Sequence, residues 1–329
     1  EFGSRKRFHP PAHRDTTLAL QGPLRRFSTR MENDRGGRLR RVLVLGWGAA
    51  AEAVLQELSA YITEGGSSGS GSASAVCVVS HTDQAAEADL RDVCTRLGFE
   101  CVLKDGSAEI LEQARRFEPD LIISASYRKK IPASVLDLCP DAINFHPSLL
   151  PKHRGCWSGF WSLFEGDAEI GVTCHRMLEA FDAGRILHQE RIPVAADDTS
   201  ISVYRKLLPV TGACARSVLA LYFGRGLPDG EEQPEGGSYH FRKLPFDGLI
   251  QPEWSDSQVE RFIRAMHFPP FKGASILIGG QQVAVDSLEA YLCLQQSTAA
   301  RAVVAASAVT AASAAAMAVN LGPATATFA

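Results

Sequence analysis

Asn144 and His146 stand two residues apart in the stretch INFHPSLLPKHRG, residues 143–155. Side chains two residues apart on a strand point to the same face, so the pattern predicts an amide and an imidazole side by side. Such a pair suits a reaction in which a carbonyl oxygen becomes negative while a proton moves. The amide N–H can hold the oxygen, and the imidazole can hold it too or carry the proton. A hydrogen-bonded core histidine and an asparagine at a turn would explain the same residues.

Asp182 is the third polar residue of this candidate site. It lies in the stretch EAFDAGRIL, between two apolar runs, and the following Ala183-Gly184 favours a tight turn. A carboxylate there can orient His146, raise its basicity and receive protons through water. The preference of aspartate for tight turns would also explain its place near a glycine. Asp182 therefore supports a catalytic interpretation only together with Asn144 and His146.

Strands and helices alternate through the first half of the chain. Apolar, β-rich runs predict strands at 41–45, 75–80, 100–103, 120–124 and 141–145, with helical patterns between them. This alternation implies right-handed crossovers and a parallel sheet covered on both faces. The predicted fold class is therefore α/β, a doubly wound and mostly parallel sheet. Asn144 and His146 then lie at its carboxyl edge, where open α/β sheets bind ligands.

The second half predicts two further strands and a small C-terminal unit. The strands fall at 170–177 and 184–194, and a helix from Thr199 to Gly224 should be kinked or divided at Pro209. A polar, Gly/Pro-rich linker runs from Arg225 to Ser238. The unit that follows is α+β, with a helix and then a hairpin that turns on Gly279-Gly280.

Composition divides the chain into four parts. A basic arm, residues 1–40, opens with EFGS, which looks like an expression scar; residues 1–41 hold 11 Lys and Arg against 4 Asp and Glu. The arm is either disordered or the end of an organellar transit peptide, which places the protein in the cytoplasm or in an organelle matrix. A catalytic domain at 41–208 and a substrate-side domain at 209–293 follow. Residues 294–329 form an Ala-rich, low-complexity tail with too few large side chains for a core.

Several classes of protein are disfavoured. No apolar run approaches the ~20 residues that cross a bilayer, so no membrane partner is expected. The eight cysteines form no C-x-x-C pair, and we expect no metal. The stretch GWGAAAE, residues 46–52, has the G-x-G of a dinucleotide-binding turn, but Ala51 replaces the third glycine and no acid ends the second strand. A plain tight turn between strand and helix is the better interpretation.

The candidate site resembles that of the folate-dependent formyltransferase family, which includes methionyl-tRNA, glycinamide ribonucleotide and sugar-amine formyltransferases. INFHPSLLPKHRG is similar to the family's Asn-x-His followed by Ser-Leu-Leu-Pro, here Ser148–Pro151. GDAEIGVTCHRMLEAFDAGRIL carries its Asp-x-Gly turn, with Asp182 36 residues after His146. The resemblance covers about Arg41 to Leu208, and the C-terminal part more loosely. The combination of motifs is specific, although no single motif is.

The resemblance implies a Rossmann-like formyltransferase domain whose one-carbon donor is 10-formyltetrahydrofolate. The acceptor amine attacks the formyl carbon, and Asn144 and His146 stabilise the tetrahedral oxyanion. Asp182 raises the basicity of His146 and receives protons. The pterin lies between the loop at 127–132 and the Asp loop at 178–182. The implied folate contacts are Tyr127, Lys129, Lys130, Ile131, Leu149, Leu150, Pro151, Glu179, Ala180 and Phe181. A polar surface loop and leucines packed over the sheet would explain the same residue types.

Two departures from the family pattern lie around the Asp loop. Most relatives read Asp-Glu-Gly before the turn, where this chain has Leu178-Glu179-Ala180, and Arg185 follows the turn glycine. On the substrate side we expect contacts from Ser148, Arg154 and Trp157. Other aromatic residues, Phe160, Trp161 and the segment FPPF at 268–271, suit either an acceptor cleft or ordinary packing.

The acceptor amine is expected to be small. A tRNA-binding domain should be basic, because tRNA affinity rests largely on phosphate neutralisation. Residues 209–293 hold 7 Lys and Arg against 10 Asp and Glu, which favours a small amine such as a nucleotide-linked amino sugar. The basic arm keeps organellar methionyl-tRNA formyltransferase as an alternative, and a non-catalytic binding module with the same fold is the third. The sequence leaves the oligomeric state open.

Overall fold

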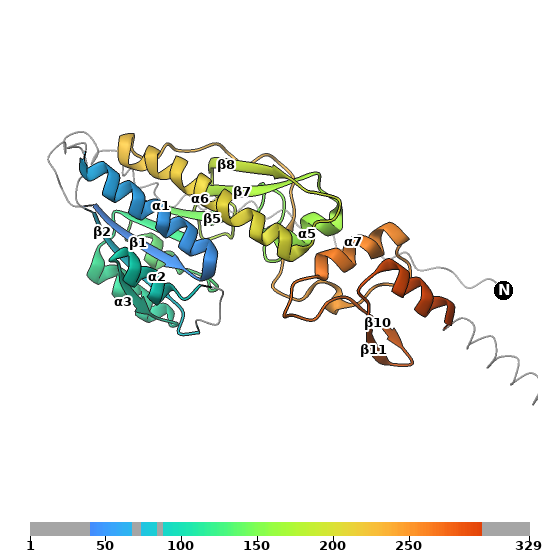
Figure 1. The fold of residues 1–329 in the computed structure, drawn as a ribbon. Coiled ribbons are helices and arrows are strands. Elements are labelled where there is room, and N and C mark those ends of the chain that lie inside the picture. The colour runs from blue at the N-terminus through green and yellow to red at the C-terminus, as the bar shows by residue number, and fades with distance from the viewer. Residues whose placement is uncertain (1–39, 68–73, 84–87, 298–329) are drawn as a thin grey trace, which may run out of the picture. The chain divides into compact units, whose positions relative to one another are not determined.

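The computed structural model describes residues 40–67, 74–83 and 88–297 (Figure 1). Nearly all of the predicted basic arm and most of the predicted Ala-rich tail lie outside these residues. The strands are β1 (Arg40–Gly46), β2 (Ser74–Ser80), β3 (Glu100–Leu103), β4 (Leu121–Ala125), β5 (Asp141–His146), β6 (Arg154–Gly155), β7 (Glu169–Arg176), β8 (Ile186–Pro193), β9 (Tyr239–His240), β10 (Ser275–Ile278) and β11 (Gln281–Ala284). The helices are α1 (Gly48–Ser67), α2 (Leu90–Leu97), α3 (Ser107–Phe117), α4 (Ala133–Leu136), α5 (Ser158–Glu165), α6 (Ser200–Arg225), α7 (Asp256–Met266) and the 3₁₀ helix η1 (Pro245–Gly248).

Seven of these strands form one sheet, in the order β3-β2-β1-β4-β5-β7-β8. Neighbours from β3 to β5 are parallel, whereas β7 pairs antiparallel with β5, and β8 pairs antiparallel with β7. The predicted doubly wound, mostly parallel α/β sheet is confirmed. Its antiparallel end matters for the site, because it sets the last residues of β7 beside the middle of β5, with Arg176 opposite Ile143, and the β7–β8 loop that follows carries Asp182 to Asn144 and His146.

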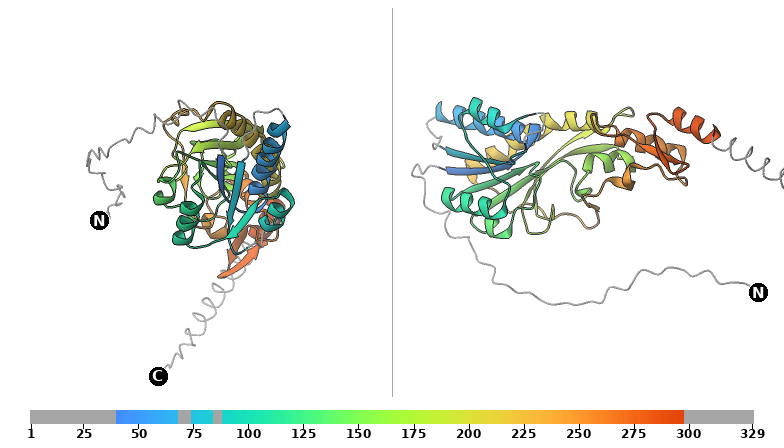
Figure 2. Two further views of the ribbon diagram at one scale, coloured as in Figure 1. Left: turned by 90° about the vertical axis from the view of Figure 1, so that its left-hand side faces the viewer. Right: turned by 90° about the horizontal axis from the view of Figure 1, so that it is seen from below.

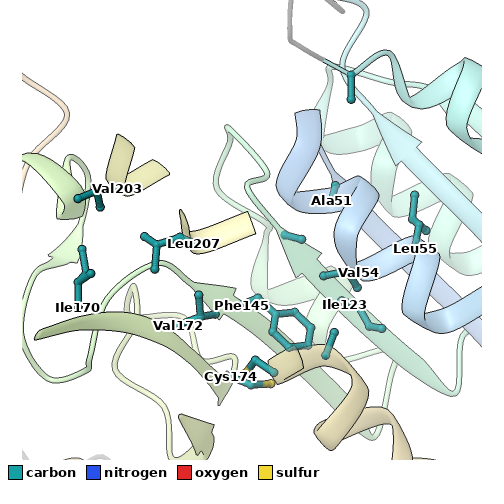
Figure 3. Close-up of a cluster of buried hydrophobic side chains, with 14 of the residues drawn as sticks. Ala51, Val54, Leu55, Ile123, Phe145, Ile170, Val172, Cys174, Val203 and Leu207 are labelled. Atoms are coloured by element: carbon teal, nitrogen blue, oxygen red, sulfur yellow. The ribbon is translucent and has the colours of Figure 1, made fainter. Parts of the chain in front are cut away.

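The core consists of two apolar layers, one on each face of the sheet. Val42 and Val44 of β1 join the layer covered by α1 and α6, while Leu43 and Leu45 join α3 and α4 on the other face. Figure 1 shows α1 and α6 side by side across the sheet, and Figure 2 gives two further views. In the close-up of Figure 3, residues of α1, β4, β5 and β7 gather in the first layer. This alternation is what a parallel sheet buried on both faces requires.

The turn after β1 is a tight strand-to-helix turn, as predicted. A Cβ added to Gly46 would lie 2.6 Å from the Cβ of Ala51, so the glycine permits close packing of α1 on the strand. Gly48 adopts φ 66°, in the region that favours glycine.

Local features set the limits of two helices. α2 begins at Leu90, because the Asp89 side chain accepts the backbone N–H of Arg91 and caps the helix there. α1 continues to Ser67.

α6 is one continuous helix, contrary to the predicted division at Pro209. Thr199 caps the helix, because its side chain accepts the backbone N–H of Ser202. The predicted domain boundary at 208/209 therefore falls inside an element, and the helix ends only at Arg225. By length and composition α6 is apolar enough to cross a bilayer. In this fold it is a core helix, because its apolar face is buried against α1 and the sheet.

The C-terminal unit combines α7, the β10–β11 hairpin and a helix at residues 288–297, as an α+β unit was predicted to do. Gly279 and Gly280 both have positive φ, 59° and 81°, and form the expected hairpin turn. Phe262 of α7 is completely buried and packs edge-on against Phe160 of α5 and Trp254. This aromatic contact ties the unit to the α5 side of the catalytic half.

Replacing Phe262 with alanine should lower the free energy of unfolding by about 3–5 kcal/mol, because it removes a large buried ring and leaves a cavity. Urea denaturation followed by circular dichroism measures this change. Phe271, 72% exposed, is the matched control, and its alanine variant should change stability by no more than about 0.5 kcal/mol. Equal effects of the two substitutions would contradict the assigned packing.

Candidate active site

β5 turns alternate residues toward the core and toward the site. Ile143 and Phe145 are buried in the layer under α1 and α6, and Figure 3 shows Phe145 among them. Asn144 and His146 therefore share the opposite face, as predicted. Asn144 is half-buried and His146 is buried at the carboxyl end of the strand.

Asp182 reaches this face from the loop between β7 and β8. Its carboxylate oxygens lie 3.4 Å from Asn144 Nδ2 and 3.5 Å from His146 Nδ1. The loop closes tightly: a Cβ added to Gly184 would lie 1.8 Å from the carbonyl oxygen of Arg176. Asp182 itself has φ 51°, which aspartate tolerates better than most residues. The structure thus brings together the three residues predicted to be catalytic, while their roles stay predictions.

His175 is a fourth polar residue of the site, which the sequence did not predict. β7 runs antiparallel to β5 with His175 opposite Asn144. Its Nε2 accepts a hydrogen bond from Asn144 Nδ2 at 3.1 Å, and its Nδ1–H donates to the Arg176 carbonyl oxygen at 2.8 Å. Nε2 also lies 3.4 Å from Asp182 Oδ1. A histidine in an otherwise apolar strand was the available signal, but only the antiparallel register shows which face it shares.

His146 is held with Nδ1 directed at Asp182. Its Nε2 lies 2.9 Å from the carbonyl oxygen of His153, which can only accept, so Nε2 carries the hydrogen. The neutral ring therefore has its lone pair on Nδ1, which faces the Asp182 carboxylate. A proton that arrives at Nδ1 is stabilised by that carboxylate, as a general base requires.

Burial and neighbouring charge act in opposite directions on this pair. Desolvation lowers the pKa of His146 below its ordinary 6.5, although the charge of Asp182 raises it. Desolvation raises the pKa of Asp182, but attraction by His146, contact with His175 and the Gly155 N–H outweigh it and hold that pKa at about 2. At neutral pH the site therefore contains an ionised Asp182 beside a neutral His146.

The two loops predicted to hold the pterin lie next to each other. Lys130, in the 127–132 loop, has its Nζ 3.7 Å from Glu179 Oε1 and 5.9 Å from the centre of the Phe181 ring. Glu179 and Ala180 are exposed, and Phe181 is 48% exposed. The side chains of Lys130, Glu179 and Phe181 are therefore accessible to a planar ligand.

A polar cluster that the sequence did not predict holds the 127–132 loop. His81 stacks on Tyr127 with ring centroids 4.5 Å apart, and its Nε2 accepts the backbone N–H of Arg128 at 3.1 Å. Asp105 Oδ1 lies 3.0 Å from His81 Nδ1 and accepts from Lys129 Nζ at 3.2 Å. The Tyr127 hydroxyl is buried and has no hydrogen-bond partner within the described ranges.

The predicted contacts in the loop after β5 are less accessible. Leu150 is buried, and Leu149 and Pro151 are half-buried; Ile131, in the 127–132 loop, is buried as well. Ser148, predicted as a substrate contact, is completely buried, and its hydroxyl donates to the Lys152 carbonyl oxygen at 2.7 Å. Ser148 therefore closes its own loop instead of facing a substrate.

Arg154 and Trp157 are placed differently from each other. The Arg154 guanidinium donates to Gln233 Oε1 at 3.0 and 2.6 Å, so it is engaged within the chain. Trp157 is 43% exposed and presents its ring at the surface. Phe160, by contrast, belongs to the apolar core, in agreement with ordinary packing rather than a place in an acceptor cleft. Trp161 stacks on His240 at 4.1 Å.

A second group of histidines lies beside the site. His153 Nε2 is 2.8 Å from Asp167 Oδ2, its Nδ1 is 3.2 Å from His240 Nε2, and Glu165 is near enough to join the two rings around a metal ion. Hydrogen bonds account for these distances without an ion. The Asp167 carboxylate fixes the hydrogen on His153 Nε2, and His240 then donates to the lone pair on Nδ1. We assign no metal role to this group.

Comparison with known proteins adds independent findings. The family model described as Formyl transferase matches residues 40–218. GDP-perosamine N-formyltransferase of Brucella melitensis is 42% identical over 191 residues, 58% of this chain and 73% of that protein. The protein of the same name from Brucella abortus matches to the same extent.

Solved structures share the fold. A sugar N-formyltransferase from a Shewanella species has a TM-score of 0.60 at 21% identity, covering 75% of this chain and 97% of that one. An N-formyltransferase from Helicobacter canadensis, in complex with folinic acid and dTDP-3-aminofucose, has a TM-score of 0.61 at 17% identity, covering 75% and 86%. At these identities the similarity extends to the fold alone.

The electrostatic interaction between Asp182 and His146 gives a prediction about the pKa of His146. Its ring should titrate with a midpoint below 6.5, and Asp182→Asn should move that midpoint lower, because the substitution removes the charge that opposes desolvation. Proton NMR of the histidine ring Cε1–H signals measures both midpoints, with a His146 variant to assign the signal. A midpoint that rises in Asp182→Asn would contradict the proposed electrostatics.

Proposed function

Because the chain belongs to the formyl transferase family, we propose that it transfers a formyl group from 10-formyltetrahydrofolate to the amine of a nucleotide-linked amino sugar. The observation that carries the catalytic part of the proposal is the convergence of Asn144, His146 and Asp182 at the end of β5. An amide donor and a neutral imidazole beside a buried carboxylate suit acyl transfer to an amine.

His146 is the proton acceptor in this proposal. Its Nε2–H is committed to the His153 carbonyl oxygen, which leaves Nδ1 to take the proton that the amine loses as its new C–N bond forms. Collapse of the tetrahedral adduct would then break the bond between the formyl carbon and N10 of the folate, and the same proton would pass to N10 as tetrahydrofolate leaves. Asp182, 3.5 Å away, stabilises the resulting imidazolium without itself becoming protonated, since its pKa is held at about 2. The neutral state of His146 at pH 7 is the state that this role needs.

Asn144 is the candidate oxyanion donor. Both of its amide hydrogens face protein acceptors, His175 Nε2 at 3.1 Å and Asp182 Oδ1 at 3.4 Å. The longer of these bonds is the weaker, so a negative oxygen at the formyl carbon would take over that hydrogen. His175 would keep the amide oriented during the exchange, which gives the unpredicted histidine a positioning role.

The residues around the site fit a folate donor, which supplies the formyl group. The orphaned Tyr127 hydroxyl and the exposed Phe181 ring offer a polar and an aromatic contact to a pterin. Lys129 and Lys130 are exposed cations on the same loop and suit the carboxylates of the folate tail. The formyltransferase solved with folinic acid supports this choice of donor.

The acceptor is proposed from the relatives and from the surface beside the site. Two relatives at 42% identity are GDP-perosamine N-formyltransferases. Trp157, two residues beyond Gly155, exposes an aromatic ring on which a nucleobase can stack. The mildly acidic composition of residues 209–293 disfavours a tRNA, whose phosphates require a basic surface.

Release of tetrahydrofolate during incubation with 10-formyltetrahydrofolate and GDP-perosamine tests the proposal. Wild-type protein should turn over, and His146→Ala should lower kcat by about 100- to 10,000-fold while circular dichroism stays unchanged. The Leu277→Ala variant, at an exposed position of β10, is the control with full activity. Full activity in His146→Ala would refute the site.

Parallel reactions with other acceptors separate the alternatives. Turnover with charged initiator methionyl-tRNA, and with no amino sugar, would overturn the acceptor proposal. Failure of the protein to bind 5-formyltetrahydrofolate in calorimetry would favour the non-catalytic module. Turnover with a dTDP-linked and not a GDP-linked amino sugar would retain the substrate class and change the nucleotide.

A further inference from the structure

The segment at residues 227–240, which overlaps the predicted polar linker from Arg225 to Ser238, runs along the edge of the site; we call it the strap. Its first part is fixed to the antiparallel end of the sheet. Arg176 donates to the carbonyl oxygens of Pro228 and Asp229, at 2.6 and 3.2 Å. Glu231 exchanges two backbone hydrogen bonds with Ile186 of β8, at 2.7 and 2.8 Å. The strap is therefore part of the fold on both sides of the Asp loop.

Gln233 of the strap clamps the Asp loop. Its Nε2 donates to the carbonyl oxygens of Asp182 at 2.7 Å and Gly184 at 2.8 Å. Its Oε1 accepts both hydrogen bonds from Arg154, at 3.0 and 2.6 Å. One half-buried amide thus uses both donors and its acceptor to join the loop that carries Asp182 to the strand β6. No other side chain in the described ranges is bonded to the main chain of both Asp182 and Gly184.

The far end of the strap holds residues 153–155, which form the opposite wall of the site. β9 pairs with β6, and Ser238 accepts the backbone N–H groups of His153 and Arg154, through its hydroxyl at 2.9 Å and its carbonyl at 3.0 Å. At Gly155 the contact is so close that an added Cβ would lie 2.3 Å from the His240 carbonyl oxygen. A side chain at Gly155 would push the strap away from β6.

Both catalytic groups depend on this wall. The Gly155 N–H donates to Asp182 Oδ2 at 2.7 Å, and the His153 carbonyl accepts from His146 Nε2 at 2.9 Å. Gln233 therefore fixes the main chain of Asp182. The far end of the strap fixes the main-chain groups of His153 and Gly155 that orient the His146 ring and the Asp182 carboxylate.

From these contacts we propose that Gln233 is a positioning residue for the reaction, which acts through Asp182 and holds its carboxylate at His146. The proposal deepens the proposed function and rests on it. The strap connects the C-terminal part of the chain to the candidate catalytic residues, because it leads from Gln233 through β9 into η1. Gln233 touches neither reacting group with its own side chain, so removing it should affect the reaction only by displacing Asp182.

Gln233→Met tests this role, since methionine keeps the length and the packing but loses the three polar contacts. Turnover should fall by about tenfold or more in kcat, with the KM for the acceptor changed by less than about threefold, as expected when orientation rather than binding is lost. Glu235→Gln, an exposed change on the same strap, is the matched control and should behave as wild type.

A double-variant cycle separates positioning from general stability. If Gln233 acts through Asp182, adding Gln233→Met to Asp182→Asn should cost no more than about twofold further. An additive loss in the double variant would overturn the proposal. Should Gln233→Met fail to fold, Gln233→Glu replaces it: the carboxylate still accepts from Arg154 but cannot donate to the Asp loop.

The titration of His146 gives a readout that needs no turnover. Gln233→Met should lower the His146 midpoint in the same direction as Asp182→Asn, because the stabilising carboxylate moves away from the ring, while Glu235→Gln leaves it unchanged. An unchanged midpoint in folded Gln233→Met would overturn the proposal. If wild-type protein shows no formyl transfer, the proposed function fails while this titration still decides the role of Gln233.

Discussion

The buried negative charge of Asp182 is the constraint on which the rest of the site depends. Its side chain is only 10% exposed, and removing a carboxylate from water is costly unless partners compensate for the lost hydration. Here the compensation comes from the Asn144 amide on β5 and the Gly155 N–H on β6, and a proton taken up at His146 Nδ1 adds to it. The charge is stable only while all of these segments keep their positions.

The antiparallel end of the sheet makes that arrangement possible. After β5 the chain passes through β6 and α5 and then returns in β7, which pairs antiparallel with β5. The register sets His175 opposite Asn144, and the β7–β8 loop that follows carries Asp182 to within 3.4 Å of Asn144 Nδ2 and 3.5 Å of His146 Nδ1. Gly184 permits the turn because its missing Cβ leaves room for the Arg176 carbonyl.

The strap extends the same constraint to the C-terminal half. Its backbone pairs with β8 at one end and with β6 at the other, and Gln233 spans the interval with its amide. The candidate site at the end of β5 is therefore built from three stretches separated by tens of residues. The aromatic contacts of Phe262 tie α7 to α5, so the C-terminal unit supports this wall from a second direction.

Local pattern determined the strands, the helices, the face shared by Asn144 and His146 and the turn at Asp182, because each depends on residues close together in the chain. The motif spacing also determined the family. Only the tertiary structure decided that His175, His81 and Gln233 belong to the site, that Ser148 is buried and that α6 passes through Pro209 unbroken. Those features follow from strand register, from long-range packing and from hydrogen bonds between distant segments, none of which leaves a periodic signal in the sequence.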